Sequence, residues 1–355
     1  MILEIIFPLI ILIMIGAFGL IAPLLQPQNI LFGVRIPAKV LEIKVDRIDK
    51  FKKNFILKYL VVDLLWIIFS TFLILQYGME RYLITIAGQL LLQFSLYIYQ
   101  NKAVENWKAG IIRDIPEMKS KSTAKVIDST YRKERLTVKK GWYLIPLGLL
   151  IFQIAINLIN YDTIIGQTEQ VRQISSFVLS SFFIFMILIW QNYVIVNAKQ
   201  NIRAGEPEKS REQNIIFRRR WSLYLFIVLS IIIFANLILN LVYLDILKWN
   251  LEITENLYFI VPVVTLLGSL ILSIIMGQSG ARIKLTHKKS DSDYDDIDDD
   301  QYWKFGIFYY NPQDPSVFIE KRMGIGWTLN FANPRALIFI FSILAIVVIS
   351  MLTGK

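Results

Sequence analysis

Residues 222–245 read SLYLFIVLSIIIFANLILNLVYLD, an almost unbroken run of apolar side chains. A helix needs about 20 such residues to cross the hydrocarbon core of a bilayer. Apolar and polar residues do not alternate along the run, as they would in a strand of a membrane barrel. The run therefore predicts a transmembrane α-helix, in which every backbone polar group is satisfied internally.

Seven further stretches have the same character, and 55% of the 355 residues are hydrophobic. The first stretch carries Glu4 and lacks a basic start, so we expect it to remain as a helix rather than to be cleaved as a signal peptide. The sequence predicts an all-α polytopic membrane protein with about eight transmembrane helices. The eight expected spans are roughly 5–25, 57–77, 82–100, 143–161, 174–196, 222–245, 257–277 and 336–352.

Lys and Arg gather in alternate loops and so predict the orientation of the chain. Residues 26–54 hold seven of them, 101–142 eleven, 198–220 seven and 278–335 eight, whereas each intervening loop holds one. The positive-inside rule then places the four basic loops in the cytoplasm and both termini outside. We expect the net charge of +10 to attract anionic lipids to the cytoplasmic face. No basic folded module favours nucleic acid as a partner.

The chain divides into four expected regions. Residues 1–277 form a seven-helix membrane region with basic cytoplasmic loops, 278–301 an acidic linker, 302–335 a small cytoplasmic β-rich module, and 336–355 the last transmembrane helix with a short external tail. In the module, FGIFYYN and SVFIEKR are β-prone, while NPQDP and MGIG are turn signals. We therefore predict a β-hairpin or a three-stranded meander before the last helix, packed on the membrane surface or on other loops.

Two basic loop segments have apolar residues at helical spacing. FGVRIPAKVLEIKVDRIDKFKKNF, residues 32–55, predicts a turn at Gly33 and a helix start at Pro37. The segment is either a solvated connector that sets the topology, which is the favoured interpretation, or a helix lying in the membrane interface. KSTAKVIDSTYRKERL, residues 121–136, predicts a second amphipathic helix capped by Ser122 or Thr123. The three arginines at 218–220 mark the boundary where the next span begins.

Three expected spans carry amide side chains four residues apart, which places each pair on one helix face. The pairs are Gln89 with Gln93, Gln153 with Asn157, and Asn236 with Asn240. Interhelical hydrogen bonding is the usual role of such residues, and the lining of a polar route is the alternative.

Asp63 is the one carboxylate well inside an expected span. An ionisable residue within a membrane is a candidate functional site. Asp63 also lies only five residues beyond Lys58, so a second interpretation is pairing with a lysine that reaches toward the interface.

Two motifs near the end of the seventh span invite a catalytic or metal-binding interpretation. GQSG at 277–280 resembles the surroundings of a rhomboid-type serine nucleophile, but the single histidine, His287, lies in a charged stretch with no helix to hold it. We expect a helix C-cap instead, with Arg282 following at the interface. DSDYDDIDDD at 291–300 begins like a calcium loop, yet it has Asp296 at the glycine position and Tyr302 at the glutamate position. A solvated acidic linker whose charge faces the basic loops is the better interpretation.

The β-rich module contains aromatic residues suited to a membrane interface, namely Trp303, Tyr309, Tyr310 and Trp327. Its glycines and prolines follow from the turns that they make. If the module docks a partner, the expected contacts are its aromatic face and the turn residues Asn311, Asp314 and Arg322.

The pattern WKFGIFYYNPQDPSVFIEKRMGIGWTLNF, 303–331, resembles a small domain of unknown function found at the C-terminus of Firmicute membrane proteins. The motifs GQSGAR, 277–282, and FGVRIP, 32–37, which contains Arg35, resemble those of the associated multi-span family related to SdpI, an immunity protein. The resemblance implies a bacterial plasma-membrane protein that is not an enzyme, with no cofactor.

The sequence thus predicts a role in toxin immunity, envelope stress or signalling through a protein or peptide partner. The alternative is a small-solute or ion transporter whose route is lined by the amide pairs and gated near Asp63. A membrane enzyme has the least support, and Ser279 would be its best residue.

Overall fold

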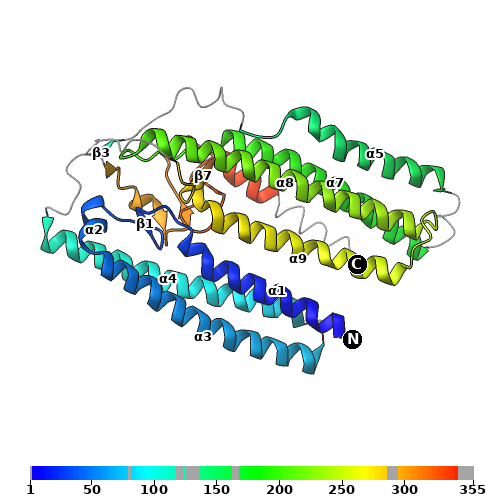
Figure 1. Ribbon diagram of the computed structural model, residues 1–355, viewed down its shortest axis with the longest axis horizontal. Helices are drawn as coiled ribbons and strands as arrows, with labels where there is room; N and C mark the ends of the chain where they lie inside the picture. Colours follow the sequence, from blue (N-terminus) through cyan, green and yellow to red (C-terminus); the bar gives the residue numbers. More distant parts are fainter. Residues whose placement is uncertain are drawn as a thin grey trace. The chain divides into compact units, whose positions relative to one another are not determined.

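The computed structural model describes residues 2–78, 81–116, 123–124, 136–161, 168–285 and 295–342. It is mostly helical, with small strand pairs, most of them antiparallel. Contacts divide the chain into two units, which we describe separately. Figure 1 shows the helices and strands coloured along the sequence. The helices are α1 (Ile2–Ile21), α2 (Ala38–Ile43), α3 (Val45–Tyr77), α4 (Tyr82–Asp114), α5 (Leu144–Ile159), α7 (Thr168–Asn197), α8 (Pro207–Tyr243) and α9 (Leu251–Met276).

Six helical segments of the described chain are long and apolar enough to cross a membrane. They are Val45–Tyr77, Tyr82–Asp114, Lys140–Ile159, Val171–Asn197, Pro207–Tyr243 and Leu251–Gly280. A shorter apolar stretch, Pro8–Leu24, corresponds to the first expected span, and the last expected span is described only as far as residue 342. A multi-pass helical membrane protein is confirmed, while eight crossings stay a prediction.

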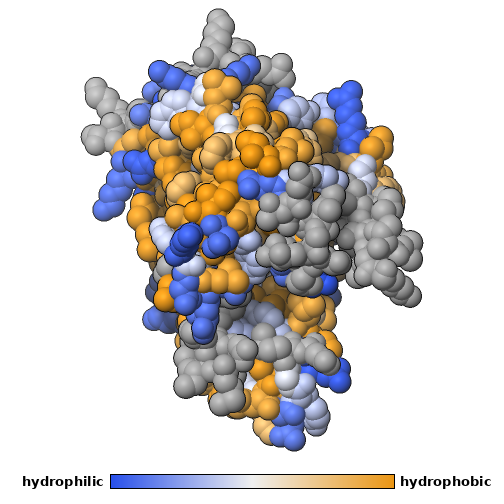
Figure 2. Space-filling model, turned by 90° about the vertical axis from the view of Figure 1, so that its right-hand side faces the viewer, coloured by the Kyte–Doolittle hydropathy of each residue, from blue (hydrophilic) through white to orange (hydrophobic). Residues whose placement is uncertain are grey.

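The surface of the helices is apolar, as a protein with lipid around it requires. Much of the face drawn in Figure 2 is hydrophobic, with hydrophilic residues among it. On α3 the exposed side chains include those of Leu64, Leu65, Ile68, Phe72 and Leu75. A water-soluble protein rarely exposes such a continuous patch.

Three helices extend further than the sequence indicated. The segment expected to be a solvated connector or an interfacial helix is the short helix α2 followed by the start of α3, which continues without a break to Tyr77. Neither Gly nor Pro interrupts α3 before Gly78, so nothing ends it at the interface. Likewise α4 runs on to Asp114, and α8 begins at Pro207, so that the arginines at 218–220 are helical. Thr123 is in a strand, and the rest of the second expected amphipathic helix lies largely outside the described residues.

The first unit comprises residues 1–129, 198–214 and 270–355. In it α1, α3 and α4 run side by side (Figure 1). At one end of these helices Ile48 and Phe55 of α3 and Tyr97 of α4 pack against Phe32, which is fully buried. The rings of Phe32 and Phe55 lie 5.0 Å apart. This cluster explains why the amphipathic start of α3 packs on protein instead of lying on lipid.

Four pairs of short strands accompany these helices. They are β1 (Ile30–Leu31) with β2 (Val34–Arg35), β3 (Thr123–Ala124) with β4 (Asp295–Asp296), β5 (Trp303–Lys304) with β6 (Phe308–Tyr309), and β7 (Phe318–Glu320) with β8 (Trp327–Leu329). The β3–β4 pair is parallel and the others are antiparallel. Residues 302–335, which we call the C-terminal module, therefore hold two hairpins rather than a meander. NPQDP connects the hairpins, and a bridge between Tyr309 and Asn330 joins them.

The second unit comprises residues 130–197 and 215–269, and contains α5, α7, and parts of α8 and α9. Polar side chains link its helices. The amide of Asn236 on α8 donates to Ser180 and Ser181 on α7 at 2.9 and 3.1 Å, and accepts from Tyr258 on α9 at 2.9 Å. The amides on α8 therefore act in part as the interhelical contacts that the sequence predicted.

Candidate functional site

Two turns with the sequence Phe-Gly hold the site together. Phe32 and Gly33 join β1 to β2, and Phe305 and Gly306 belong to the turn between β5 and β6. All four residues have positive φ, which is ordinary for glycine and strained for phenylalanine. The turns touch through their glycines, because a Cβ on Gly33 would lie 2.6 Å from the Cα of Gly306.

Arg35 on β2 binds a cluster of carboxylates. Its Nε donates to Asp299 at 3.0 Å and its Nη1 donates to Asp296 at 2.7 Å. Its backbone N–H donates to Asp300 at 3.0 Å. The Arg35 side chain is only 10% exposed, so these bonds replace the water that the guanidinium gives up.

Arg322, in the turn between β7 and β8, reaches the same carboxylates from the C-terminal module. It donates to Asp300 from Nη1 at 2.5 Å, pairs with Asp299 through Nη2, and donates to the carbonyl of Gly33 at 2.6 Å. Its guanidinium lies 5.0 Å from the ring centre of Trp303. Arg322 therefore joins the module, the acidic residues and the N-terminal hairpin.

Lys108 adds a third cation from α4. Its Nζ donates to Asp298 at 2.5 Å and to Asp300 at 2.7 Å, and its side chain is 10% exposed. We call Arg35, Lys108 and Arg322, together with Asp296 and Asp298–Asp300, the ion-pair network. It connects a helix of the membrane region to segments that are far apart in the sequence.

The network has a clear electrostatic signature at Asp299. Burial alone would raise the pKa of this carboxyl group, but the guanidinium groups of Arg322 and Arg35 outweigh burial and lower the pKa to about 2. Trp303 contributes a further hydrogen bond, 3.2 Å long, to the other carboxylate oxygen. The pKa of Asp300 is also lowered, because Arg322 and Lys108 outweigh its burial. Both groups are therefore anions over the physiological range.

Asp296 ties two more segments to the network. Its Oδ2 accepts from the amide of Asn29 at 2.6 Å, and its Oδ1 accepts from the backbone N–H of Ala204 at 2.7 Å. Ala204 belongs to the connection before α8, which thereby lies against the acidic residues. Asp296 accordingly holds the N-terminal hairpin and the connection before α8 together at one side of the site.

The GQSGAR motif fixes the other wall. Gln278 donates to the carbonyl of Gly326 at 2.9 Å and accepts from its N–H at 2.8 Å, which holds the β7–β8 turn. Arg282 donates to the carbonyls of Leu24 and Ile274, so it caps helical carbonyls at the end of α9. The expected C-cap is confirmed, since α9 ends at Met276 and Gly277 has φ +65°.

Ser279 has a structural environment in this motif. Its hydroxyl donates to Glu320 at 2.5 Å, and the other carboxylate oxygen of Glu320 accepts from Asn214 at 2.5 Å. Glu320 is buried on β7. Glu320 of the module thus binds both Ser279, which follows α9, and Asn214 of α8, while His287 lies outside the described residues.

The NPQDP turn is organised by Asn330. Its Nδ2 donates to the carbonyls of Asn311 and Asp314 at 2.9 Å each, and its Oδ1 accepts from the N–H of Asn311 at 3.1 Å. The Asp314 carboxylate pairs with Lys199 and accepts from the hydroxyl of Tyr309. Burial would raise the pKa of Asp314, but the hydrogen bonds from Lys199 and Ser316, together with the charge of Lys199, outweigh burial and lower the pKa.

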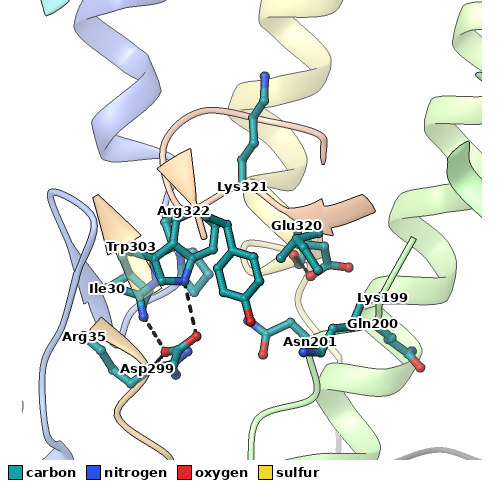
Figure 3. Close-up of a pocket in the computed structure, with 14 residues that line it drawn as sticks. Ile30, Arg35, Lys199, Gln200, Asn201, Asp299, Trp303, Glu320, Lys321 and Arg322 are labelled. Carbon is teal, nitrogen blue, oxygen red and sulfur yellow. Dashed lines mark hydrogen bonds and ion pairs between the residues drawn. The ribbon is translucent and has the colours of Figure 1, made fainter. Parts of the chain in front are cut away.

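These contacts enclose a polar pocket with a volume of about 370 Å³. It is lined by segments 199–202, 296–299 and 309–315, together with Arg35 and Tyr302. A smaller cavity of about 70 Å³ shares part of its lining. Figure 3 shows Arg35, Trp303 and Arg322 around Asp299, with Lys199, Gln200 and Asn201 across the cavity and Lys321 pointing away.

Five of the predicted binding residues meet at this pocket and its network: Arg35, Trp303, Asn311, Asp314 and Arg322. The sequence did not single out Lys108, Lys199, Asp299, Asp300 or Asn330. The acidic run was visible, but its partners are distant in sequence: Arg322 lies 22 residues from Asp300, Lys108 lies 192 residues from it and Arg35 lies 265 residues from it. A single sequence carries no signal for such pairing.

The acidic segment needs a correction. Residues 278–301 were expected to form a solvated linker, but Asp296, Asp299 and Asp300 of the described part are mostly buried in ion pairs. Their charge does face basic residues, as expected, because three cations converge on them. The opening positions of the calcium-like loop, Asp291 and Asp293, lie outside the described residues.

The aromatic residues also need a correction. Trp303 and Tyr309 were expected at a membrane interface, but they are 7% and 3% exposed and pack on each other with ring centres 5.1 Å apart. Tyr310 is 49% exposed and remains available at the surface. Two-stranded hairpins are too small to be stable alone, so the rings of Trp303 and Tyr309 pack together to form a small core between them.

The amide pairs of the membrane region lie in separate places. Gln89 and Gln93 on α4 both donate to Asp63 on α3, at 3.0 and 3.3 Å. Lys58 lies over the ring of Tyr99 at 4.7 Å, so the expected pairing of Lys58 with Asp63 is absent from the described contacts.

The other two amide pairs belong to the second unit. Asn236 is bonded as described above. The side chains of Gln153, Asn157 and Asn240 are buried and have no hydrogen-bond partner among the described residues. The three pairs thus belong to two different units, and a route lined by all of them stays a prediction.

Comparison with known proteins gives one partial match. Residues 312–337, which include most of the C-terminal module, match a family of unknown function (DUF5808). No curated protein and no solved structure matches the chain.

Proposed function

We propose that the chain is a non-enzymatic, multi-pass protein of a bacterial plasma membrane that acts in toxin immunity, envelope stress or signalling. It does so by binding a protein or peptide partner at the polar pocket beside the C-terminal module. The basic loops face the cytoplasm and attract anionic lipids, which places the pocket on the cytoplasmic side. The membrane-protein architecture and the match to a family of unknown function support the setting.

The observation that carries the proposal is a preformed polar pocket assembled from segments far apart in the chain. Residues of the N-terminal hairpin, the 199–202 connection, the acidic segment and the NPQDP turn all reach it. The buried ion pairs and the Asn330 hydrogen bonds hold its walls before any ligand arrives. A preorganised pocket loses little conformational entropy of its own on binding, so less of the interaction energy is spent on ordering the protein.

The chemistry of the lining fits a polypeptide. Asn201 and Gln313 are exposed side chains at the pocket, and neither has an ion pair to break. Lys199 and Asp314 offer both signs of charge, while Tyr302 and Tyr309 offer aromatic surface. Such mixed polar and aromatic linings are typical of protein recognition sites.

A complementation experiment tests the proposal. A strain lacking the gene receives the wild-type chain, Asn201→Trp, which fills the pocket, or Glu208→Trp, which places the same indole at an exposed residue outside it. We measure sensitivity to a panel of secreted antimicrobial peptides and the expression of an envelope-stress reporter. Glu208→Trp should restore the wild-type phenotype, and Asn201→Trp should not.

Two results would count against the proposal. One is a deletion strain with unchanged sensitivity across the panel and unchanged reporter expression. The other is full complementation by Asn201→Trp at wild-type protein level in the membrane, because a filled pocket would then be harmless.

A further inference from the structure

A second site lies within the three helices α1, α3 and α4, away from the polar pocket. Asp63 of α3 accepts hydrogen bonds from Gln89 and Gln93 of α4, and both donors also reach carbonyls of α1. Gln89 is fully buried. The neighbouring side chains include Trp66, Leu92 and Leu96, so the carboxyl group lies in apolar surroundings.

No cation accompanies Asp63 in the part of the chain that the structure describes. The nearest lysine in sequence, Lys58, lies over Tyr99. The titratable neighbour is Tyr59, whose hydroxyl donates to the carbonyl of Gly16 at 2.9 Å. From α4 the facing groups are the two neutral amides, and from α1 they are glycines and backbone carbonyls. A charge inside a membrane without a partner is costly, whereas a neutral carboxylic acid is much less so.

The space around Asp63 excludes a hydrated ion. The gap between Asp63, the two glutamines and their neighbours is too small to hold a water molecule. Glycines of α1 close it from the other side, since a Cβ on Gly16 would lie 2.2 Å from Asp63 Oδ2. A proton needs no such room.

We propose that Asp63 is a proton-binding site within the membrane region. Binding forms one O–H bond on the Asp63 carboxylate, the proton comes from water at the membrane surface, and release returns it there. The carbonyl oxygen of Gln89, which is buried and has no donor, supplies an acceptor for the new hydroxyl after the amide rotates. Because the same amide holds the carbonyl of Leu12 at 2.9 Å, proton binding is coupled to the packing of α1.

The site is also compact enough to transmit this change. Gly16 and Gly19 lie on one face of α1, and a Cβ on Gly19 would lie 2.1 Å from the Tyr59 hydroxyl and 2.4 Å from the Gln93 carbonyl oxygen. Small residues allow such close helix packing in membranes. A rearranged Gln89 or Gln93 therefore moves directly against α1.

Infrared spectroscopy of the purified, reconstituted protein tests the proposal during a pH titration. The wild type should show the carbonyl stretch of a protonated carboxyl group in an apolar site, and the band should shift in D₂O. Asp63→Asn, a neutral change of the same shape, should remove the band. Asp49→Asn, a matched change at an exposed carboxylate at the start of α3, should leave it.

A second variant keeps the test decisive. Gln89→Leu removes a hydrogen-bonding partner of the Asp63 carboxyl group, so the carbonyl band should move to a higher frequency than in the wild type. The proposal is overturned if the wild type lacks the band or if folded Asp63→Asn retains it. Neither result depends on a partner, so the outcome is independent of the polar pocket.

Discussion

Gly33 allows the β1–β2 hairpin to pack against the β5–β6 hairpin. It has φ +81°, and its Cα faces the backbone of Gly306, which has φ +67°. No side chain fits between two backbones in contact, and a residue other than glycine is strained at this φ. The FGVRIP motif and the FGIF turn thus share one physical requirement.

Gly33→Ala should lower the free energy of unfolding by about 3 kcal/mol or more, from backbone strain together with overpacking. Gly326→Ala is the control, because Gly326 has φ +100° but no atom within 4 Å of a new Cβ. It should cost only the strain, about 1 to 2 kcal/mol. Thermal unfolding in detergent measures both, and equal losses would contradict the contact between the turns.

Arg322 gives a second prediction at the residue scale. Arg322→Ala leaves Asp299 and Asp300 without their principal partner, and removing one member of a buried pair costs about 3 to 5 kcal/mol. Arg113→Ala should cost less than about 1 kcal/mol, because the Arg113 side chain is 82% exposed beside Asp114. Chemical unfolding of the two variants gives the comparison, and a stable Arg322→Ala protein would show that the network is not structural.

Among the elements, the acidic segment 295–300 connects four separate parts of the chain. It accepts bonds from β2, from α4, from the connection before α8 and from the β7–β8 turn. The pKa values of Asp299 and Asp300 are lowered, so the contribution of these two carboxyl groups to stability depends on pH. A carboxyl whose pKa is lower in the folded chain stabilises it above the unfolded pKa and loses that effect as pH falls.

For Asp299 the ordinary pKa is 3.8 and the folded value is about 2. The stabilisation is therefore complete above about pH 5 and lost as the pH falls through about 2. Its size is up to about 2 kcal/mol, reduced because the side chain is 31% exposed. Unfolding temperatures between pH 6 and 2 should fall less steeply in Asp299→Asn than in the wild type, and parallel curves would contradict this assignment.

The same elements show what a sequence can predict. The apolar runs at 57–77 and 222–245 required helices, and the turn signals NPQDP and MGIG required bends, because these properties are local. Asn311, Asp314 and Arg322 were found for the same reason. The partners of the acidic segment were not, since pairing of Asp300 with Lys108 depends on how distant segments meet.

The exposure of single residues was predicted least well. Trp and Tyr are typical of membrane interfaces, yet Trp303 and Tyr309 are buried. The small hairpins have few other apolar side chains with which to form a core. The start of α3 and the end of α4 were not predicted, because hydropathy indicates only the part of a helix that lies in the bilayer. Each helix continues beyond that part until a residue or a contact stops it.

At the scale of the whole molecule, the chain combines membrane helices with a polar pocket built from their connecting segments. The first unit holds both the pocket and the Asp63 site. The chain contains no cysteine, so labels can be introduced at chosen positions without background. The central claim, that the pocket receives a protein or peptide, is directly testable in cells.

The decisive measurement is site-specific photocrosslinking in intact cells, with a photoreactive residue in place of Gln313 at the pocket. We predict a discrete adduct that is lost when Asn201→Trp fills the pocket and is kept with Glu208→Trp. Photoreactive residues at position 208 should give no such adduct. The absence of an adduct at 313, or an adduct that persists unchanged in Asn201→Trp, would contradict the account.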